Sequence, residues 1–184
     1  FNGLRSLIPA DHASLAASSG IYLGPDFHFD LSRAGVSLYG VNPTPGRSNP
    51  MAQVVRLQAK ILQVRSVDTP QTVGYGATHQ VTKPAKIATL GIGYADGYLR
   101  SLSNSTTAYI GDIEVPVVGR VSMDLTTIDV TGIADAELAT GCLVDLIGPN
   151  NPVDQVASQA STIGYEILTR LGHRFERRYI SDEV

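Results

Sequence analysis

Residues 107–130, TAYIGDIEVPVVGRVSMDLTTIDV, contain three short apolar runs, at 107–110, 113–118 and 125–130. Alternation of apolar and polar side chains with a period of two is typical of a strand that buries one face. Gly111 and Asp112 separate the first two runs, and both residue types are common in tight turns. The segment therefore predicts consecutive strands joined by short turns.

Similar runs lie on both sides of this segment. Residues 55–64, 87–92, 143–147 and 173–180 also predict strands, and turn residues such as those at 148–150 separate them. Only residues 153–171 have the i, i+3, i+4 apolar spacing of a helix, which Gly172 would end. Many short strands with glycine-rich turns predict a mainly β fold, an antiparallel barrel or a sandwich.

The first 45 residues have a different pattern. Their apolar bursts are short and interrupted by glycine and proline, as at the end of an α/β unit. Residues 41–50 contain three prolines, which continue neither a helix nor an inner strand. We therefore expect two domains, with residues 1–45 as the end of an α/β unit and residues 46–184 forming the β domain.

Composition excludes several classes of partner. The 184 residues are 43% hydrophobic and 17% charged, with a net charge of −3, so they lack the basic clusters that nucleic acid requires. No apolar stretch is long enough to span a membrane, and the four histidines lack metal-ligand spacing, so we expect neither a membrane nor a metal site. One cysteine, Cys142, and a start at Phe1 suggest a cytoplasmic fragment, in which the sequon at Asn104 would be idle.

Six short motifs follow one another in a distinctive order. They are AASSG at 16–20, SRAGVSLYG at 32–40, VGYGAT at 73–78, GIGYADGY at 91–98, GRVSMD at 119–124 and GYE at 164–166. In this order they resemble the C-terminal half of the alanine racemase family, over residues 12–178. The resemblance implies a C-terminal antiparallel β-barrel domain, preceded by the last strand–helix units of an N-terminal α/β (TIM-type) barrel. Ala17, Gly74 and His79 depart from the family's usual residues.

The resemblance also implies pyridoxal 5'-phosphate (PLP) as cofactor, which acts as an electron sink when an amino acid is racemised. It assigns the cofactor phosphate to Ser18, to the backbone of Gly35 and Val36, and to the hydroxyl of Tyr165. It places Arg33 at the pyridine nitrogen, which a guanidinium would keep unprotonated because it donates only. Without the motifs, Ser18 would be interpreted as a helix cap, Tyr165 as a core aromatic and Arg33 as a surface arginine.

Racemisation requires acid/base groups on the two faces of the substrate Cα. By resemblance, Tyr75 is one of them and reaches into the active site of the partner subunit of a homodimer. A free phenol ionises near pH 10, roughly, so this role requires positive charge nearby. Met123 and Tyr94 would bind the substrate, with the Met123 backbone N–H at its carboxylate, and Asp124 would support the site. Turn or core packing is the alternative for each.

The family's cofactor-holding lysine lies in a Lys-Ala-Asn-x-Tyr-Gly motif that these 184 residues do not contain. Lys60, Lys83 and Lys86 are the chain's lysines, and none has a comparable context. Alone, the chain is therefore expected to be inactive.

The leading interpretation is an alanine racemase fragment whose intact protein interconverts L-alanine and D-alanine for peptidoglycan. A related PLP racemase acting on serine or on several amino acids fits the same motifs. A non-catalytic β-barrel module for dimerisation or binding is an alternative from another class. The sequence does not determine the exact substrate or whether the role is biosynthetic or catabolic. It also does not determine whether residues 1–45 are ordered.

Overall fold

The computed structural model describes residues 1–180, whose chain contacts divide into two compact units, the first of residues 1–55 and the second beginning at residue 56. The proline-rich segment at 41–50 belongs to the first unit. No helix within residues 1–180 combines the length and the apolar character needed to cross a bilayer.

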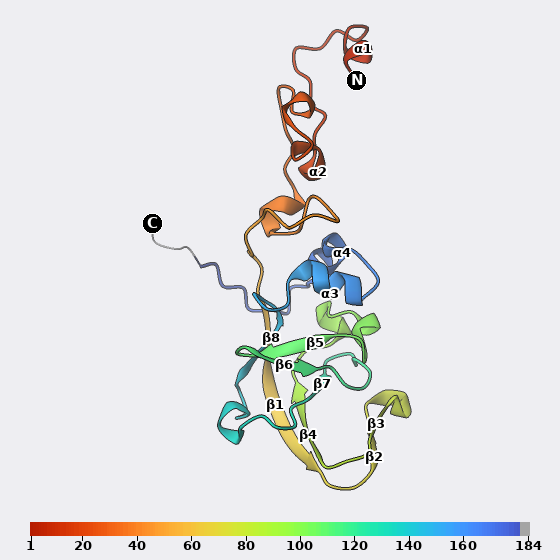
Figure 1. Cartoon of the computed structure of the whole chain (residues 1–184), viewed down its shortest axis with the longest axis vertical. Coiled ribbons are helices and arrows are strands. Elements are labelled where there is room, and N and C mark those ends of the chain that lie inside the picture. The colour runs from red at the N-terminus through yellow and green to blue at the C-terminus, as the bar shows by residue number, and fades with distance from the viewer. Residues whose placement is uncertain (181–184) are drawn as a thin grey trace. The chain divides into compact units, whose positions relative to one another are not determined.

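The helices and 3-10 helices (η) are short, and the strands concentrate in the second unit (Figure 1). The helices are α1 Asn2–Arg5, α2 Ser18–Ile21, α3 Val153–Gln159 and α4 Gly164–Arg170, and the 3-10 helices are η1 Pro25–Phe27, η2 Val36–Tyr39, η3 Tyr75–Ala77, η4 Tyr94–Asp96, η5 Arg100–Leu102 and η6 Asp135–Glu137. The strands are β1 Leu57–Val67, β2 Gln71–Val73, β3 His79–Val81, β4 Ala85–Leu90, β5 Thr107–Ile110, β6 Ile113–Pro116, β7 Thr126–Asp129 and β8 Leu143–Ile147.

The first unit is built from α1, α2, η1, η2 and extended segments. Two isolated bridges pair these segments, Ser14 with Phe29 and Ala17 with Arg33. The second bridge is parallel, and the Arg33 N–H donates to the Ala16 carbonyl at 2.8 Å. Residues about 16 positions apart in sequence therefore lie side by side.

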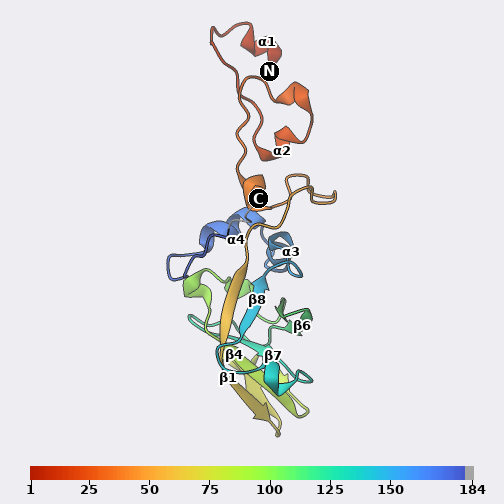
Figure 2. The same ribbon diagram turned by 90° about the vertical axis from the view of Figure 1, so that its left-hand side faces the viewer.

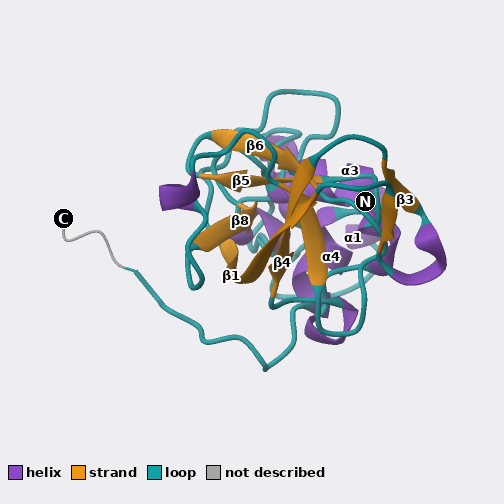
Figure 3. Cartoon of the chain, turned by 90° about the horizontal axis from the view of Figure 1, so that it is seen from below, coloured by secondary structure: helices purple, strands orange, loops and turns teal. Residues whose placement is uncertain are grey.

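The second unit is a nearly closed antiparallel sheet. Six strands pair in the order β6-β5-β8-β1-β4-β7, and β1 curves along the length of the sheet (Figures 1 and 2). A bridge between Val117, just after β6, and Ile128 of β7 brings the two edge strands together. The view from below shows the strands around a common interior (Figure 3). The mainly β, barrel-like fold predicted from the sequence is confirmed.

Alternating burial explains why these sequences form the barrel. In β7, Thr126 and Ile128 are buried while their neighbours are half-exposed, and in β1 Leu57, Ala59 and Ile61 point inward. β5 and β6 meet at the predicted Gly111-Asp112 turn, where Ile110 pairs with Ile113 and Gly111 has φ +58. Such a φ is favourable for glycine at the first position of a two-residue hairpin.

The continuous helix predicted over 153–171 is wrong, because the chain forms α3 and α4 instead. Ser161, between them, has φ +58, which an α-helix does not permit. Ile163, which a continuous helix would place on the buried face, is 62% exposed. Figures 1 and 2 both show the two short helices beyond one end of the sheet.

The strand predicted at 173–180 is also wrong, since these residues are irregular. Tyr179 and Ile180 are 91% and 89% exposed, so the segment has no apolar face to bury. Its arginines instead bind carboxylates and carbonyl groups of nearby loops.

The sequence patterns did not predict the two-stranded sheet β2–β3. Its strands have three residues each and pair Gln71 with Val81 and Val73 with His79. Val73 and Val81 pack on a small core with Val67, Ile87 and Val118. This anchor holds the hairpin whose tip carries Tyr75.

Candidate active site

A group of hydroxyls and backbone amides surrounds Ser18 in the first unit. Ser18 begins α2 and is 3% exposed. Its Oγ accepts hydrogen bonds from the Gly35 N–H at 2.9 Å, the Ser37 N–H at 3.3 Å and the Ser37 hydroxyl at 3.1 Å. Val36 lies between these partners and begins η2. The structure thus brings Ser18, Gly35 and Val36 together.

The chemistry of this donor group fits a phosphate, because N–H and O–H donors are the groups that bind phosphate oxygens. Ser37 was missed by sequence reasoning, although it is a hydroxyl residue two positions after Gly35. The fit depends on donors and not on a missing side chain, because a Cβ on Gly35 would lie 3.9 Å from the Ser18 Oγ, an ordinary contact.

Arg33 lies on the segment bridged to Ala17, directly beside Ser18 in sequence. Its exposed guanidinium donates to the hydroxyl of Ser14 and, at 3.4 Å, to the carbonyl of Leu15. Pairing of the two extended segments explains how a residue 15 positions after Ser18 joins the same region.

In the second unit, Tyr75 occupies the tip of the β2–β3 hairpin. Its side chain is 75% exposed, and the flanking Gly74 and Gly76 have φ of +77 and +70. A Cβ on Gly74 would lie 2.9 Å from the backbone nitrogen of Arg120, and one on Gly76 would lie 2.8 Å from its guanidinium Nη1. The turn therefore sits directly against Arg120, which brings positive charge to it.

Tyr94 and Met123 lie on two loops that are locked together. The Tyr94 N–H donates to the Ser122 carbonyl and the Ala95 N–H donates to the Met123 carbonyl, both at 2.9 Å. A Cβ on Gly93 would collide with the carbonyl groups of Ser122 and Met123. The side chains of Tyr94 and Met123 stay partly exposed, at 42% and 55%. The two substrate-binding candidates thus lie on loops that are joined by direct backbone contact.

Arg174 connects the same two loops through their carboxylates. Its Nη2 lies 2.9 Å from an oxygen of Asp124, and its Nε lies 3.2 Å from an oxygen of the buried Asp96. The hydrogen bond with Asp124 and the charge of Asp96 raise the pKa of Arg174. Asp96 also accepts the Gly93 N–H at 2.9 Å, which closes the Tyr94 turn. No motif singled out Arg174 or Asp96.

Tyr165 lies in the first turn of α4 and is 47% exposed. The helix is fixed by Glu166, whose pKa is lowered by hydrogen bonds from Thr162 and then Arg170. The other end of α4 touches the Tyr94 turn, because a Cβ on Gly97 would collide with the Arg170 carbonyl. The second unit therefore gathers the loops of Tyr75, Tyr94 and Met123, with α4 against the Tyr94 turn.

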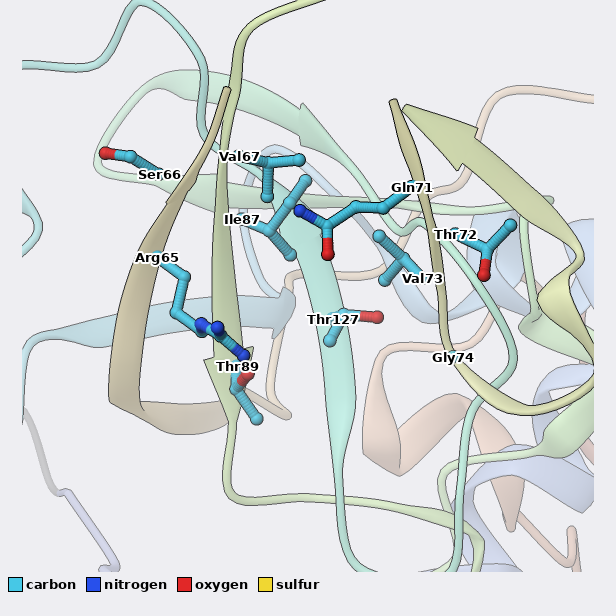
Figure 4. Close-up of a pocket in the computed structure, with 10 residues that line it drawn as sticks. All are labelled: Arg65, Ser66, Val67, Gln71, Thr72, Val73, Gly74, Ile87, Thr89 and Thr127. Carbon is cyan, nitrogen blue, oxygen red and sulfur yellow. The ribbon is translucent and has the colours of Figure 1, made fainter. Parts of the chain in front are cut away.

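A cavity of about 200 Å³ lies beside the hairpin that carries Tyr75. Figure 4 shows Gln71 and Val73 of β2 pointing toward Ile87 of β4 and Thr127 of β7. None of the lining residues is a predicted site residue. The candidate active site is therefore the surface that exposes Tyr75, Tyr94 and Met123, and not this cavity.

The lysines lie outside these motifs in sequence. Lys60 is in β1, Lys83 follows β3, and Lys86 in β4 pairs with Asp135 at 2.6 Å. All three belong to the second unit, whereas Ser18, Arg33, Gly35 and Val36 belong to the first. Among residues 1–180, no three His, Cys, Asp or Glu side chains gather as a metal site would require.

Comparison with known proteins identifies the class to which this fold and these loops belong. The family model "Alanine racemase, C-terminal domain" matches residues 54–179. The alanine racemase of Rhodospirillum rubrum is 54% identical over 179 residues, covering 97% of this chain and 48% of that protein. The catabolic alanine racemase of Mesorhizobium japonicum is 47% identical over 180 residues, covering 98% and 47%.

Solved structures agree. The crystal structure of the Bartonella henselae alanine racemase with covalently bound pyridoxal phosphate matches with a TM-score of 0.91 and 42% identity, covering 98% of this chain and 50% of that one. The biosynthetic alanine racemase of Pseudomonas aeruginosa matches with a TM-score of 0.88 and 36% identity, covering 97% and 50%. The chain belongs to the alanine racemase family. It spans about half the length of the curated relatives that it matches.

Proposed function

We propose that this chain is the C-terminal half of a PLP-dependent alanine racemase, a cytoplasmic homodimer that interconverts L-alanine and D-alanine for peptidoglycan synthesis. The observation that carries the proposal is the exposed Tyr75, presented on a glycine-flanked turn against Arg120, within a chain of this family. The PLP-bound Bartonella henselae relative supports the choice of cofactor.

Residues of the first unit, joined by Tyr165 of the second unit, would hold the cofactor. The hydroxyl of Ser18 and the amides of Gly35 and Val36, together with the Tyr165 hydroxyl, would bind its phosphate, and Arg33 would donate to its pyridine nitrogen. When bound, PLP supplies an electron sink for the substrate Cα. Because Arg33 cannot give up a proton to that nitrogen, it would keep the sink moderate and so limit side reactions.

Residues of the second unit would handle the substrate and its proton. The Tyr75 Oη would take the Cα proton from one face of the alanine or return it there, and a group upstream of this chain would serve the other face. The Met123 N–H would bind the substrate carboxylate, and the Tyr94 hydroxyl would lie beside the substrate. Asp124 would support them, because Arg174 ties it to the Asp96 that closes the Tyr94 turn.

In this proposal the 184-residue chain is inactive alone, because it contains no lysine in the family's motif context. A racemase for serine or for several amino acids is the related alternative. A non-catalytic barrel module would require no joint role for Tyr75 and Arg33, so substitution of both would leave its dimerisation or binding unchanged.

The test is Tyr75→Phe in the longer protein that contains this chain. We expect racemisation to fall by about 10²- to 10⁴-fold in both directions, the usual contribution of one acid/base group. Exchange of the Cα proton should persist mainly from one enantiomer, because the group on the other face survives. Deuterium exchange and turnover are measured for each enantiomer, and near-parental rates in both directions would refute the proposal.

A further inference from the structure

The turn after η5 contacts two loops, the turn that carries Tyr75 and the loop that begins at Gly119. Leu102, the last residue of η5, is fully buried and anchors the turn. The next residue, Ser103, accepts the Val121 N–H at 2.9 Å through its Oγ. Asn104 follows with φ +55, a left-handed conformation that Asn adopts more readily than most residues.

The Asn104 side chain uses both ends of its amide. Its Oδ1 accepts the Gly119 N–H at 2.6 Å, and its Nδ2 donates to the Thr78 Oγ1 at 3.2 Å. Thr78 ends the Tyr75 turn, and Gly119 begins the loop that leads to Met123. One side chain therefore joins the hairpin tip to the loop that would bind the substrate.

The two loops already touch where side chains are missing. A Cβ on Gly119 would lie 2.9 Å from the Val73 carbonyl oxygen, and a Cβ on Gly74 would meet Arg120 at a similar distance. Backbone contact alone allows sliding, whereas a hydrogen bond to each loop fixes their register. Proton transfer is sensitive to such a shift, since a displacement of 1 Å can cost about 100-fold in rate.

We infer that Asn104 is a positioning residue that holds Tyr75 in register with the Met123 loop. This inference rests on the proposed function. It gives the Asn104-Ser105-Thr106 motif a role in the site, because the amide that a glycan would occupy is engaged with Gly119 and Thr78.

The test compares Asn104→Gly with Asn104→Asp in the longer, PLP-loaded protein. Glycine keeps the left-handed backbone and removes both hydrogen bonds, while aspartate accepts the Gly119 N–H and can accept the Thr78 hydroxyl proton. We expect Asn104→Gly to lower kcat about 10- to 100-fold with little change in KM. Asn104→Asp should restore most of the rate. Asn150→Gly, which removes an exposed bond to Asp112, is the matched control and should not change kcat.

Two further readouts separate positioning from general stability. Hydrogen exchange of the Gly119 amide, measured without cofactor, should accelerate in Asn104→Gly and not in Asn150→Gly. In a Tyr75→Phe background, Asn104→Gly should not lower the residual one-enantiomer proton exchange further. An unchanged kcat in Asn104→Gly, or an equal loss with and without Tyr75, would overturn the inference. A full rate in Tyr75→Phe alone would instead overturn the proposed function.

Discussion

Glycines determine how the loops of the candidate site meet. Gly93 faces two carbonyl groups of the Met123 loop, and Gly74 faces the Arg120 backbone. At both places a methyl group would occupy space already taken by main chain, which cannot rotate away as a side chain can. The site is therefore held by backbone contact at single residues.

At Gly93 this contact predicts a large cost for the smallest side chain. Gly93→Ala should lower the free energy of unfolding by about 3 kcal/mol, at the upper end for overpacking, because the carbonyl groups of Ser122 and Met123 must move. Gly111→Ala is the control, since its φ of +58 costs about 1 kcal/mol but its Cβ meets nothing within 4 Å. Urea denaturation of each variant measures the difference. Equal losses would show that the Gly93 contact is not tight.

The motifs supplied candidate site residues but not the side chains that hold their loops. Tyr75 stands between two glycines and Tyr94 follows one, a pattern readable in the sequence. Arg174 and Asn104 bind residues that lie 15 to 78 positions away in sequence, and both stand in irregular segments that have no periodicity to read. Contacts of this kind arise only when the barrel closes, so sequence reasoning missed both residues.

At the scale of elements, local patterns predicted the strands well. The apolar runs at 107–110 and 143–147 predicted β5 and β8 with their observed ends, because a glycine directly follows each run. The break between α3 and α4 was missed because Ser161 carries no local signal for a positive φ. The β2–β3 hairpin was missed because its short polar strands depend on the core under Val73 for support.

The segment between η4 and η5 contains a buried phenol with a predictable pH effect. Tyr98 is 2% exposed, and burial raises the pKa of its hydroxyl, with a partial offset from Thr106. In the unfolded chain the phenol ionises near pH 10, roughly, while in the folded chain it stays neutral. Below about pH 10 the contribution of Tyr98 to the free energy of unfolding is therefore fully present. It falls as the pH rises from there toward the pKa of the folded state.

We expect Tyr98→Phe to remove this dependence. The parent should lose up to about 1.4 kcal/mol of unfolding free energy per pH unit above pH 10 through this group, and the variant should not. Urea denaturation at pH 9, 10 and 11 measures both proteins. Tyr179→Phe, at a 91% exposed position, is the control and should follow the parent. Parallel profiles for the parent and Tyr98→Phe would contradict the expected effect of burial.

At the scale of the whole molecule, the candidate residues divide between two units. The cofactor candidates Ser18 and Arg33 lie in the first unit, and the substrate and proton candidates lie in the second. The chain spans about half the length of the curated relatives that it matches. This supports a site that residues outside these 184 complete. In the proposed function, Tyr75 serves a site whose cofactor is held by a partner subunit.

Hybrid dimers of the longer protein test this claim most directly. One variant carries Tyr75→Phe and the other lacks the upstream cofactor-holding lysine, and each alone should be nearly inactive. Random pairing makes half of the dimers hybrid, and each hybrid would contain one intact site if the site is shared between subunits. We expect an equal mixture to regain about a quarter of the parental turnover. Hybrids that form but remain inactive would contradict it.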